Sequence, residues 1–359
     1  MSGDPGLEYA AAREGAALLL LPDRAVIAVT GPLRQKFLHN LLSNAVEGRK
    51  PGEGCQAALM DVKGHLLALL RVQVTSDAVV LEVPADSAER IEALLVHYRV
   101  AAPVRFARPA VTVLALLGPQ ANAVLERAGF AVSTPAASST PAAPPTPAAS
   151  FPLAVSPAAS PAASPTPAAF PALATDAHVD GTLAGVTVRV GRGGDLPAGG
   201  LVLHVPLEAM AAVQAALVDA GAHPIGRDTF DTLRIEDGRP WYGLDVTEEN
   251  LLHETGLVGQ YHSPTKGCYV GQEVIARLEA RGGNVNKRLR GLTLSARAVR
   301  GAAVSAGDKD IGRVTSAAVS PRLGPIALAY VHRNQAEPGT AVSVDGRTAT
   351  VVEVPFPNP

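Results

Sequence analysis

A single cysteine between two glycines is the most chemically informative feature of the sequence. Residues 266–273 read KGCYVGQE, so Gly267 and Gly271 bracket Cys268 in a predicted turn, and residues 272–280 have the pattern of a helix. A thiol just ahead of a helix N-terminus and near the ammonium group of Lys266 is favoured as the reactive thiolate. A lone cysteine is also common as an inert packing residue, so the spacing alone leaves both roles open.

A second segment places a carboxylate between arginines. Residues 226–245 read GRDTFDTLRIEDGRPWYGLD, which contains Arg234, Glu236 and Arg239. A carboxylate such as Glu236 can accept two N–H donors at once from the edge of a planar ring. The alternative role of Glu236 is a charge on a helix surface, paired with one of the two arginines.

These two segments resemble a known family. KGCYVGQE resembles the KGCYxGQE signature of the YgfZ family, and residues 226–245 are similar to the D-x-LR-x-E-x-G run of the wider glycine-cleavage T-protein (GcvT) superfamily. VIAVTGPLRQKFLHNLL and IGRVTSAAVSPRLGPIALAYV look like the opening strand and helix and the C-terminal barrel of that superfamily. The resemblance implies an α+β fold, with two related ferredoxin-like α+β domains around a central folate site and a small C-terminal β-barrel.

The resemblance also implies a function and a set of site residues. We expect a folate-binding protein that uses tetrahydrofolate or a derivative, has no metal site, and supports the assembly or repair of iron-sulfur clusters, including those of tRNA-modifying enzymes. Its partners would be folate and iron-sulfur client or assembly proteins, with tRNA involved only indirectly. Cys268 is the expected catalytic residue. The expected folate-binding residues are Glu236, against the pterin ring, with Arg234, Tyr242, Lys266, Gln272 and Arg277.

One departure from the superfamily bears on catalysis. T-proteins that transfer an aminomethyl group carry paired aspartates, one of them catalytic, where this chain has Ala68 and Leu69. Asp61 precedes the neighbouring glycine and is expected to lie elsewhere. Glycine-cleavage chemistry is therefore disfavoured, and whether the protein is an enzyme stays open.

Two other functions stay in competition with this one. The first is a folate-dependent aminomethyltransferase or demethylase that acts with a different base. The second is a tRNA-binding module, for which binding should weaken steeply with salt. The basic residues that such a module would use are Arg277, Arg281, Lys287, Arg288 and Arg290.

Composition narrows the class of protein further. The 359 residues include 31 Lys and Arg against 33 Asp and Glu, so no overall charge favours nucleic acid or an anionic membrane. Two cysteines do not suggest a disulfide framework, which favours a reducing compartment. No signal peptide is recognisable, and no apolar run approaches the roughly 20 residues of a membrane span. We therefore expect a cytoplasmic protein, and the resemblance to the superfamily implies a monomer.

The pattern of the chain predicts four segments. Residues 1–132 are predicted as a first α+β domain, with a helix over 32–46 and a hairpin formed by 66–74 and 79–83. Residues 133–175 consist almost wholly of Pro, Ala, Ser and Thr, which predicts a flexible insertion. Residues 176–286 are predicted as a second α+β domain that contains a glycine-rich hairpin and a helix ending before Gly221. Residues 287–359 are predicted as a β-barrel.

Overall fold

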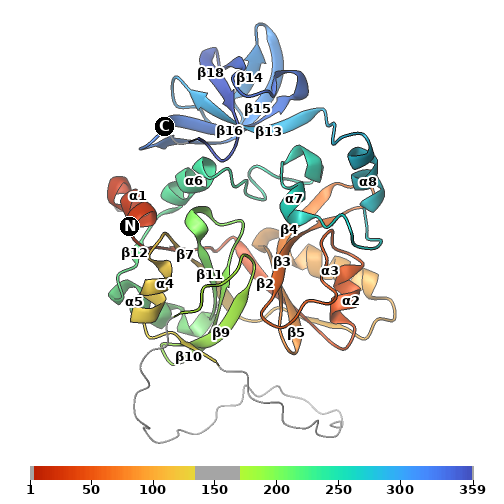
Figure 1. Ribbon diagram of the computed structural model, residues 1–359, viewed down its shortest axis with the longest axis vertical. Coiled ribbons are helices and arrows are strands. Elements are labelled where there is room, and N and C mark those ends of the chain that lie inside the picture. The colour runs from red at the N-terminus through yellow and green to blue at the C-terminus, as the bar shows by residue number, and fades with distance from the viewer. Residues whose placement is uncertain (1–3, 134–169, 358–359) are drawn as a thin grey trace, which may run out of the picture.

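The computed structural model describes residues 4–133 and 170–357, which form two β-sheets, their covering helices and a closed barrel (Figure 1). The barrel lies above the two sheets in Figure 1, with helices α6 (Arg227–Glu236) and α7 (Val258–Tyr261) in between. The predicted α+β class with a C-terminal barrel is confirmed. Most of the predicted insertion, residues 134–169, lies outside the described residues.

The five-stranded sheet, here called sheet B, comes from the N-terminal part of the chain. Its strand order is β3-β4-β5-β2-β6, and each neighbouring pair is antiparallel. The predicted hairpin is confirmed as β4 and β5. Helices α2 (Arg34–His39) and α3 (Ala88–Arg99) cover one face through Phe37, Ile91 and Leu95. The strands are β2 (Arg24–Thr30), β3 (Gly54–Met60), β4 (Leu66–Val74), β5 (Ala78–Pro84) and β6 (Arg105–Ala107).

The seven-stranded sheet, here called sheet A, combines two distant parts of the chain. Its strand order is β12-β1-β7-β11-β10-β9-β8. Residues 1–132 therefore contribute strands to both sheets. Helices α4 (Ala121–Arg127) and α5 (Met210–Asp219) pack on it through Val124 and Val213. The strands are β1 (Ala17–Leu20), β7 (Val111–Leu117), β8 (Ala131–Val132), β9 (His178–Leu183), β10 (Val186–Arg192), β11 (Leu201–Pro206) and β12 (His223–Pro224).

The two sheets share a buried core on the faces that turn away from helices α2 to α5. Leu19 and Val113 of sheet A and Val80 of sheet B belong to one apolar cluster, which also contains Phe230 of α6 and Trp241. Helix α6 thus packs over the junction of the sheets. This packing places the polypeptide after α6 at the centre of the molecule, where all three parts meet.

The barrel begins at Lys287, the residue from which the sequence predicts it. It is closed in the order β13-β16-β15-β14-β17-β18. Its interior is filled by small and branched apolar side chains such as Val304, Ala327 and Val351. The strands are β13 (Lys287–Leu294), β14 (Ala303–Ala306), β15 (Lys309–Ser320), β16 (Gly324–His332), β17 (Ala341–Val344) and β18 (Arg347–Val352).

Helix ends agree with the sequence in two places and differ in one. Helix α5 ends before Gly221, whose φ of 99° suits glycine, and helix α8 spans Gln272–Ala280 as predicted. The predicted helix over 32–46 is wrong beyond His39. The side chain of Ser43 donates to Tyr261 O at 2.5 Å and that of Asn44 donates to Gln56 O at 2.8 Å. These side-chain bonds to β3 and α7 compete with continued helix.

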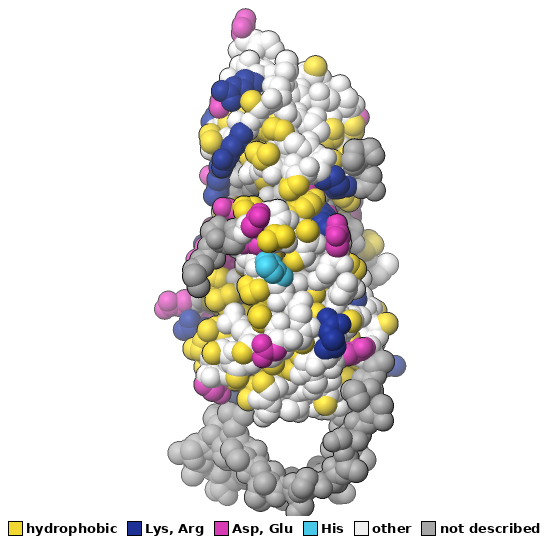
Figure 2. All heavy atoms as spheres, turned by 90° about the vertical axis from the view of Figure 1, so that its left-hand side faces the viewer, with side chains coloured by type: hydrophobic (Ala, Val, Ile, Leu, Met, Phe, Trp, Pro, Cys, Tyr) yellow, Lys and Arg dark blue, Asp and Glu magenta, His cyan; other side chains and the backbone are white. Residues whose placement is uncertain are grey.

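Within residues 4–133 and 170–357, no helix is long and apolar enough to cross a membrane. Figure 2 views the molecule from the side on which α1 (Pro5–Glu14) lies in Figure 1. On that face, basic and acidic side chains are interspersed with apolar ones, so they do not form one extended basic surface. This distribution does not favour recognition of a nucleic-acid backbone on that face.

Candidate functional site

A cavity of about 460 Å³ lies at the centre of the molecule, where sheet B, the β10–β11 turn and helices α6 and α7 meet. Its volume falls in the range of pockets that hold cofactor-sized molecules. The wall is mostly polar and includes four glycines. The lining residues are Gln56, Thr175, Asp176, Arg192, Gly193, Gly194, Leu196, Gly199, Asp237, Arg239, Gly259 and Gln260. We call this the central cavity.

Hydrogen bonds hold the separate segments of the central cavity in place. The side chain of Asn44 donates to Gln56 O on β3 at 2.8 Å and to Gln260 O on α7 at 3.2 Å. On the opposite wall, Ala198 N donates to the carboxylate of Asp237 at 2.7 Å. The cavity is therefore formed by the fold and does not need a ligand to assemble it.

Two residues with side chains adopt left-handed backbone conformations at the wall. Asp176, which lines the cavity, has a φ of 63°, and Ala198, in the β10–β11 turn, has a φ of 53°. Such conformations are uncommon for residues other than glycine and concentrate at binding and catalytic sites. Both lie on the side of the cavity formed by sheet A.

The wall also contains two arginine residues whose Nε atoms have no partner among the described residues. The Nε atoms of Arg192 and Arg239 are buried, and neither has a hydrogen-bond partner among the described residues. Buried donors of this kind are normally satisfied, so these two atoms leave the wall with hydrogen-bonding capacity that the described residues do not use. The same wall contains an acidic residue, Asp176. Burial, with the nearby charge of Asp195, raises the pKa of its carboxyl group.

A buried ionic network joins the two sheets beside the central cavity. Arg71 donates to Glu82 at 2.6 Å and also bonds Asp195 in the β10–β11 turn. His204 Nε2 lies 2.9 Å from Glu82. Burial opposes ionisation of Glu82, but Arg71 and His204 outweigh it and lower its pKa to about 2. The network thus fixes the turn that forms one wall of the central cavity.

The loop before α8 carries the predicted cysteine. Cys268 is exposed, four residues before α8 begins. Lys266 anchors the loop, because its Nζ donates to Leu42 O at 2.6 Å and to His39 O and lies 4.4 Å from the centre of the Tyr269 ring. Burial lowers the pKa of Lys266 to about 8. Cys268 is not among the residues that line the central cavity.

The predicted pterin ligand, Glu236, lies at the end of α6 beneath the barrel. Its side chain is fully buried, and its carboxylate accepts hydrogen bonds from Tyr9 at 2.9 Å, from Arg13 and from Ser320. Arg234 is also saturated, with bonds to Asp231 at 2.5 Å, Asp245 at 2.7 Å and Ser316 at 2.7 Å. Neither residue lines the central cavity. A folate-binding role for Glu236 or Arg234 stays a prediction, and it requires that these bonds be exchanged.

The other predicted residues, Tyr242, Gln272 and Arg277, lie in two places. Tyr242 donates to Leu67 O at 2.6 Å and so joins the loop after α6 to β4, and burial raises its pKa to about 12. Gln272 begins α8, and Arg277 on the same helix is exposed and pairs with Glu273 at 3.2 Å. The structure does not bring these residues together with Glu236.

Of the basic residues considered for tRNA, Lys287 lies 3.7 Å from Glu254 and Arg290 donates to Ala336 O at 2.7 Å.

The positions that carry aspartates in the superfamily are apolar and buried here. Ala68 is 0% exposed and Leu69 is 4% exposed. Asp61 caps the β3–β4 turn through bonds from Lys63 N at 2.8 Å and His65 N at 2.9 Å. No group of three or more histidine, cysteine or acidic side chains suited to a metal occurs in the described parts of the chain.

The sequence interpretation missed the residues of the central cavity, although two signals were present. The glycine-rich segment 191–200 was predicted correctly as a hairpin, and its turn forms one wall. Asp237 and Arg239 follow Glu236 directly in the same conspicuous segment. Asp176 and Gly259 have no local pattern that marks them.

Comparisons with known proteins give matches over most of the chain. Residues 287–357 match the family described as "Glycine cleavage T-protein C-terminal barrel domain". An aminomethyltransferase of Streptomyces coelicolor is 30% identical over 374 residues, which cover 97% of this chain and 88% of that protein. An aminomethyltransferase of Cutibacterium acnes is 38% identical over 186 residues, 49% of each chain. The match thus spans about half the length of that relative.

A solved structure shares the fold. The glycine cleavage system aminomethyltransferase T from Bartonella henselae superposes with a TM-score of 0.80 over 98% of this chain and 89% of that one, at 21% sequence identity. The likeness covers both sheets and the barrel. It supports the same overall architecture for the two proteins.

Proposed function

Because the chain belongs to the glycine-cleavage T-protein family of aminomethyltransferases, we propose that it binds tetrahydrofolate in the central cavity and takes part in transfer of a one-carbon unit. The observation that carries this proposal is the pair of buried, unpartnered Nε atoms of Arg192 and Arg239 in the cavity wall. The glutamate tail of folate has carboxylates that such groups bind well.

The cavity also fits the other end of folate. Asp176 can accept N–H donors from the aminopyrimidine edge of a pterin. Gly259 leaves room, because a Cβ atom built on it meets no other atom within 4 Å. Bound tetrahydrofolate would supply the N5 and N10 nitrogens that carry one-carbon units.

Asp176 is the carboxyl group that we propose for proton transfer in the cavity. The aspartate positions of the superfamily are occupied by Ala68 and Leu69, so a different acid or base is needed. The raised pKa of Asp176, caused by burial and by Asp195, lets its carboxyl group hold a proton closer to neutral pH than an exposed aspartate does. This role corresponds to an aminomethyltransferase or demethylase that acts with a different base.

Calorimetric titration with tetrahydrofolate under anaerobic, reducing conditions tests binding in the cavity. Gly259→Leu adds a side chain into open space in the wall, and we expect it to weaken binding by about tenfold or more. Gly267→Leu is the matched control, since a Cβ atom there also meets nothing within 4 Å but lies outside the cavity lining. Equal binding by both variants, or no binding by the wild-type protein, would overturn the proposal.

A second candidate function is favoured by the exposed thiol of Cys268. We propose that this cysteine, held by the Lys266 anchor, supports maintenance of iron-sulfur proteins. In cells that lack the protein, Cys268→Ala should then fail to restore iron-sulfur enzyme activity. Cys55→Ala, which removes a thiol that is only 3% exposed, should restore it. Full rescue by Cys268→Ala would remove this function from consideration.

A further inference from the structure

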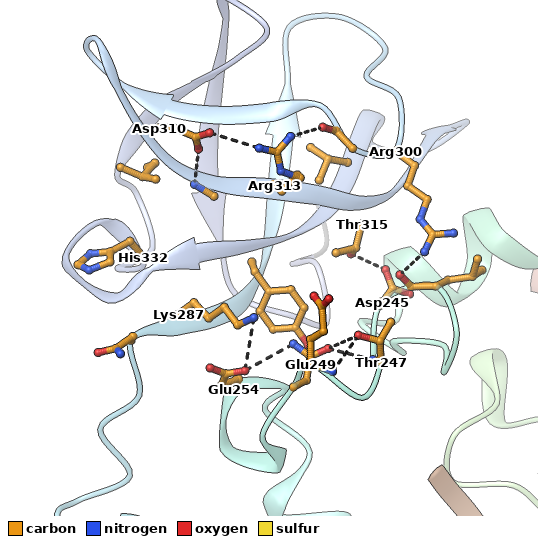
Figure 3. A pocket seen from close by; sticks show the side chains of 18 residues that line it. Asp245, Thr247, Glu249, Glu254, Lys287, Arg300, Asp310, Arg313, Thr315 and His332 are labelled. Carbon is orange, nitrogen blue, oxygen red and sulfur yellow. Dashed lines mark hydrogen bonds and ion pairs between the residues drawn. The ribbon is translucent and has the colours of Figure 1, made fainter. Parts of the chain in front are cut away.

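A second cavity, of about 710 Å³, separates the barrel from the polypeptide that links α6 to α7 (Figure 3). One wall is the linking segment 244–254, and the other is the outer face of the barrel around β15 and β16. Its lining shares no residue with that of the central cavity. We call this the barrel cavity, and the role of folate proposed above does not use it.

Tyr330 gives the barrel cavity an unsatisfied polar group. The residue lies on β16, where alternate side chains Ile326, Leu328 and Tyr330 pack in one apolar cluster with Ile235 of α6. Tyr330 is only 8% exposed, and its hydroxyl group is buried without a hydrogen-bond partner among the described residues. Burial, with the charges of Glu254 and Asp245 nearby, raises its pKa, so the hydroxyl keeps its proton and remains a donor. Residues 4–133 and 170–357 supply no acceptor for it.

Most of the carboxylates around this donor lie on one wall, and the basic groups lie on the other. The linking segment contributes Asp245, Glu249 and Glu254, and the barrel side contributes Lys287, Arg300 and Arg313 together with one carboxylate, Asp310 (Figure 3). The carboxylate of Glu249 makes no hydrogen bond or ion pair with other described residues. Glu254 forms an ion pair with Lys287 at 3.7 Å.

The basic wall is similarly open to an anion. Within the described part of the chain, Arg300 donates only to backbone carbonyls, Gly243 O at 3.1 Å and Leu244 O at 3.0 Å, so no described carboxylate pairs with its charge. Arg313 has one carboxylate partner, Asp310, at 3.4 Å, and both side chains are exposed. A ligand carboxylate is therefore attracted to this wall, while a ligand ammonium group is attracted to Glu249 on the other.

We propose that the barrel cavity binds a small zwitterion of the amino-acid type, with its ammonium group toward Glu249 and its carboxylate toward Arg300 and the hydroxyl group of Tyr330. Each charged end then meets a wall of opposite charge, and the carboxylate supplies the acceptor that Tyr330 lacks. A polyanion is disfavoured because Glu249, Glu254 and Asp245 face the same space.

Titration calorimetry with L-lysine and L-glutamate as probes, and with butylamine and butyrate as single-charge analogues, tests this proposal. We expect the amino acids to bind about tenfold more tightly than either analogue, because an analogue satisfies only one wall. Tyr330→Phe keeps the packed ring and removes only the hydroxyl group. This variant and Glu249→Gln should each weaken binding of the amino acids by about fivefold to tenfold.

Two controls separate the barrel cavity from the central one. Gly259→Leu, which fills the central cavity, should leave amino-acid binding unchanged, and so should Glu337→Gln at an exposed site outside both linings. The proposal is wrong if neither amino acid binds, if Tyr330→Phe and Glu249→Gln bind as the wild type does, or if tetrahydrofolate displaces the probes. The last result would assign the barrel cavity to folate.

Discussion

The end of helix α6 and the loop before α8 carry the two recognisable sequence patterns. The functional group of the first is buried and hydrogen-bonded, whereas that of the second is exposed. Glu236 has a fully buried carboxylate with donors from two distant parts of the chain, whereas Cys268 is exposed on a loop that Lys266 holds in place. A matched pattern thus does not distinguish a residue that holds the fold from one that meets a ligand. The number of hydrogen bonds and ion pairs that the side chain already makes does distinguish these two roles.

The largest effect that tests this contrast is expected from Glu236→Ala. Removal of the carboxylate takes away the acceptor of Tyr9 and Ser320 under the barrel and leaves Arg13 with Asp237 alone, so the free energy of unfolding should fall by about 3 kcal/mol. Urea denaturation measures the change, and Glu337→Ala at an exposed site should cost less than about 0.5 kcal/mol. If Glu236→Ala stays as stable as the wild type but loses tetrahydrofolate binding, Glu236 is a ligand and the contrast is wrong.

A smaller, pH-dependent effect is expected from His178, which begins β9 and lies next to the wall of the central cavity. Burial, with the charge of Arg189, lowers its pKa to about 4, while the unfolded chain protonates near the ordinary value of 6.5. The unfolded state therefore binds more protons between these values, and stability falls as the pH decreases from 6.5 to 4. The loss is about 3 kcal/mol at most.

The variant His178→Asn isolates this contribution. Its unfolding free energy should change less between pH 7 and pH 4.5 than that of the wild type, with His97→Asn on the exposed face of α3 as the control. An identical pH dependence in all three proteins would show that His178 is protonated equally in both states.

The smallest effect on stability is expected at Cys268. Cys268→Ala should change the free energy of unfolding by less than about 0.5 kcal/mol, because the side chain is exposed. Burial raises the pKa of Cys55 to about 11, so native protein at pH 8 should react quickly with Ellman's reagent at one thiol only. Cys268→Ala should abolish that fast reaction. Two fast thiols in the wild type would contradict the contrast between the cysteines.

Local patterns predicted much of the fold. The barrel from Lys287, the helix that ends before Gly221 and the β4–β5 hairpin all depend on neighbours in sequence, and the structure confirms them. The helix over 32–46 failed because Ser43 and Asn44 bond to residues more than ten positions away. The sheets also do not coincide with the predicted segments, because long-range pairing decides the strand order. Strands β1 and β7 of the first segment belong to one sheet with β10 and β11 of the second.

The candidate site was less predictable than the fold. The central cavity combines Gln56, Asp176, the β10–β11 turn, Arg239 and Gly259, which are separated by long stretches of chain. No local pattern predicts that these segments meet. Nor does one predict that the Nε atoms of Arg192 and Arg239 lack partners among the described residues. The signature around Cys268 was easy to find because it is contiguous.

Hydrogen exchange with and without saturating tetrahydrofolate tests the central claim most directly. If folate binds in the central cavity, exchange should slow in residues 192–200 and 258–261, which line it, and the protection should disappear in Gly259→Leu. Protection confined to residues 244–254 and 309–315 around the barrel cavity, or no protection at all, would contradict the account.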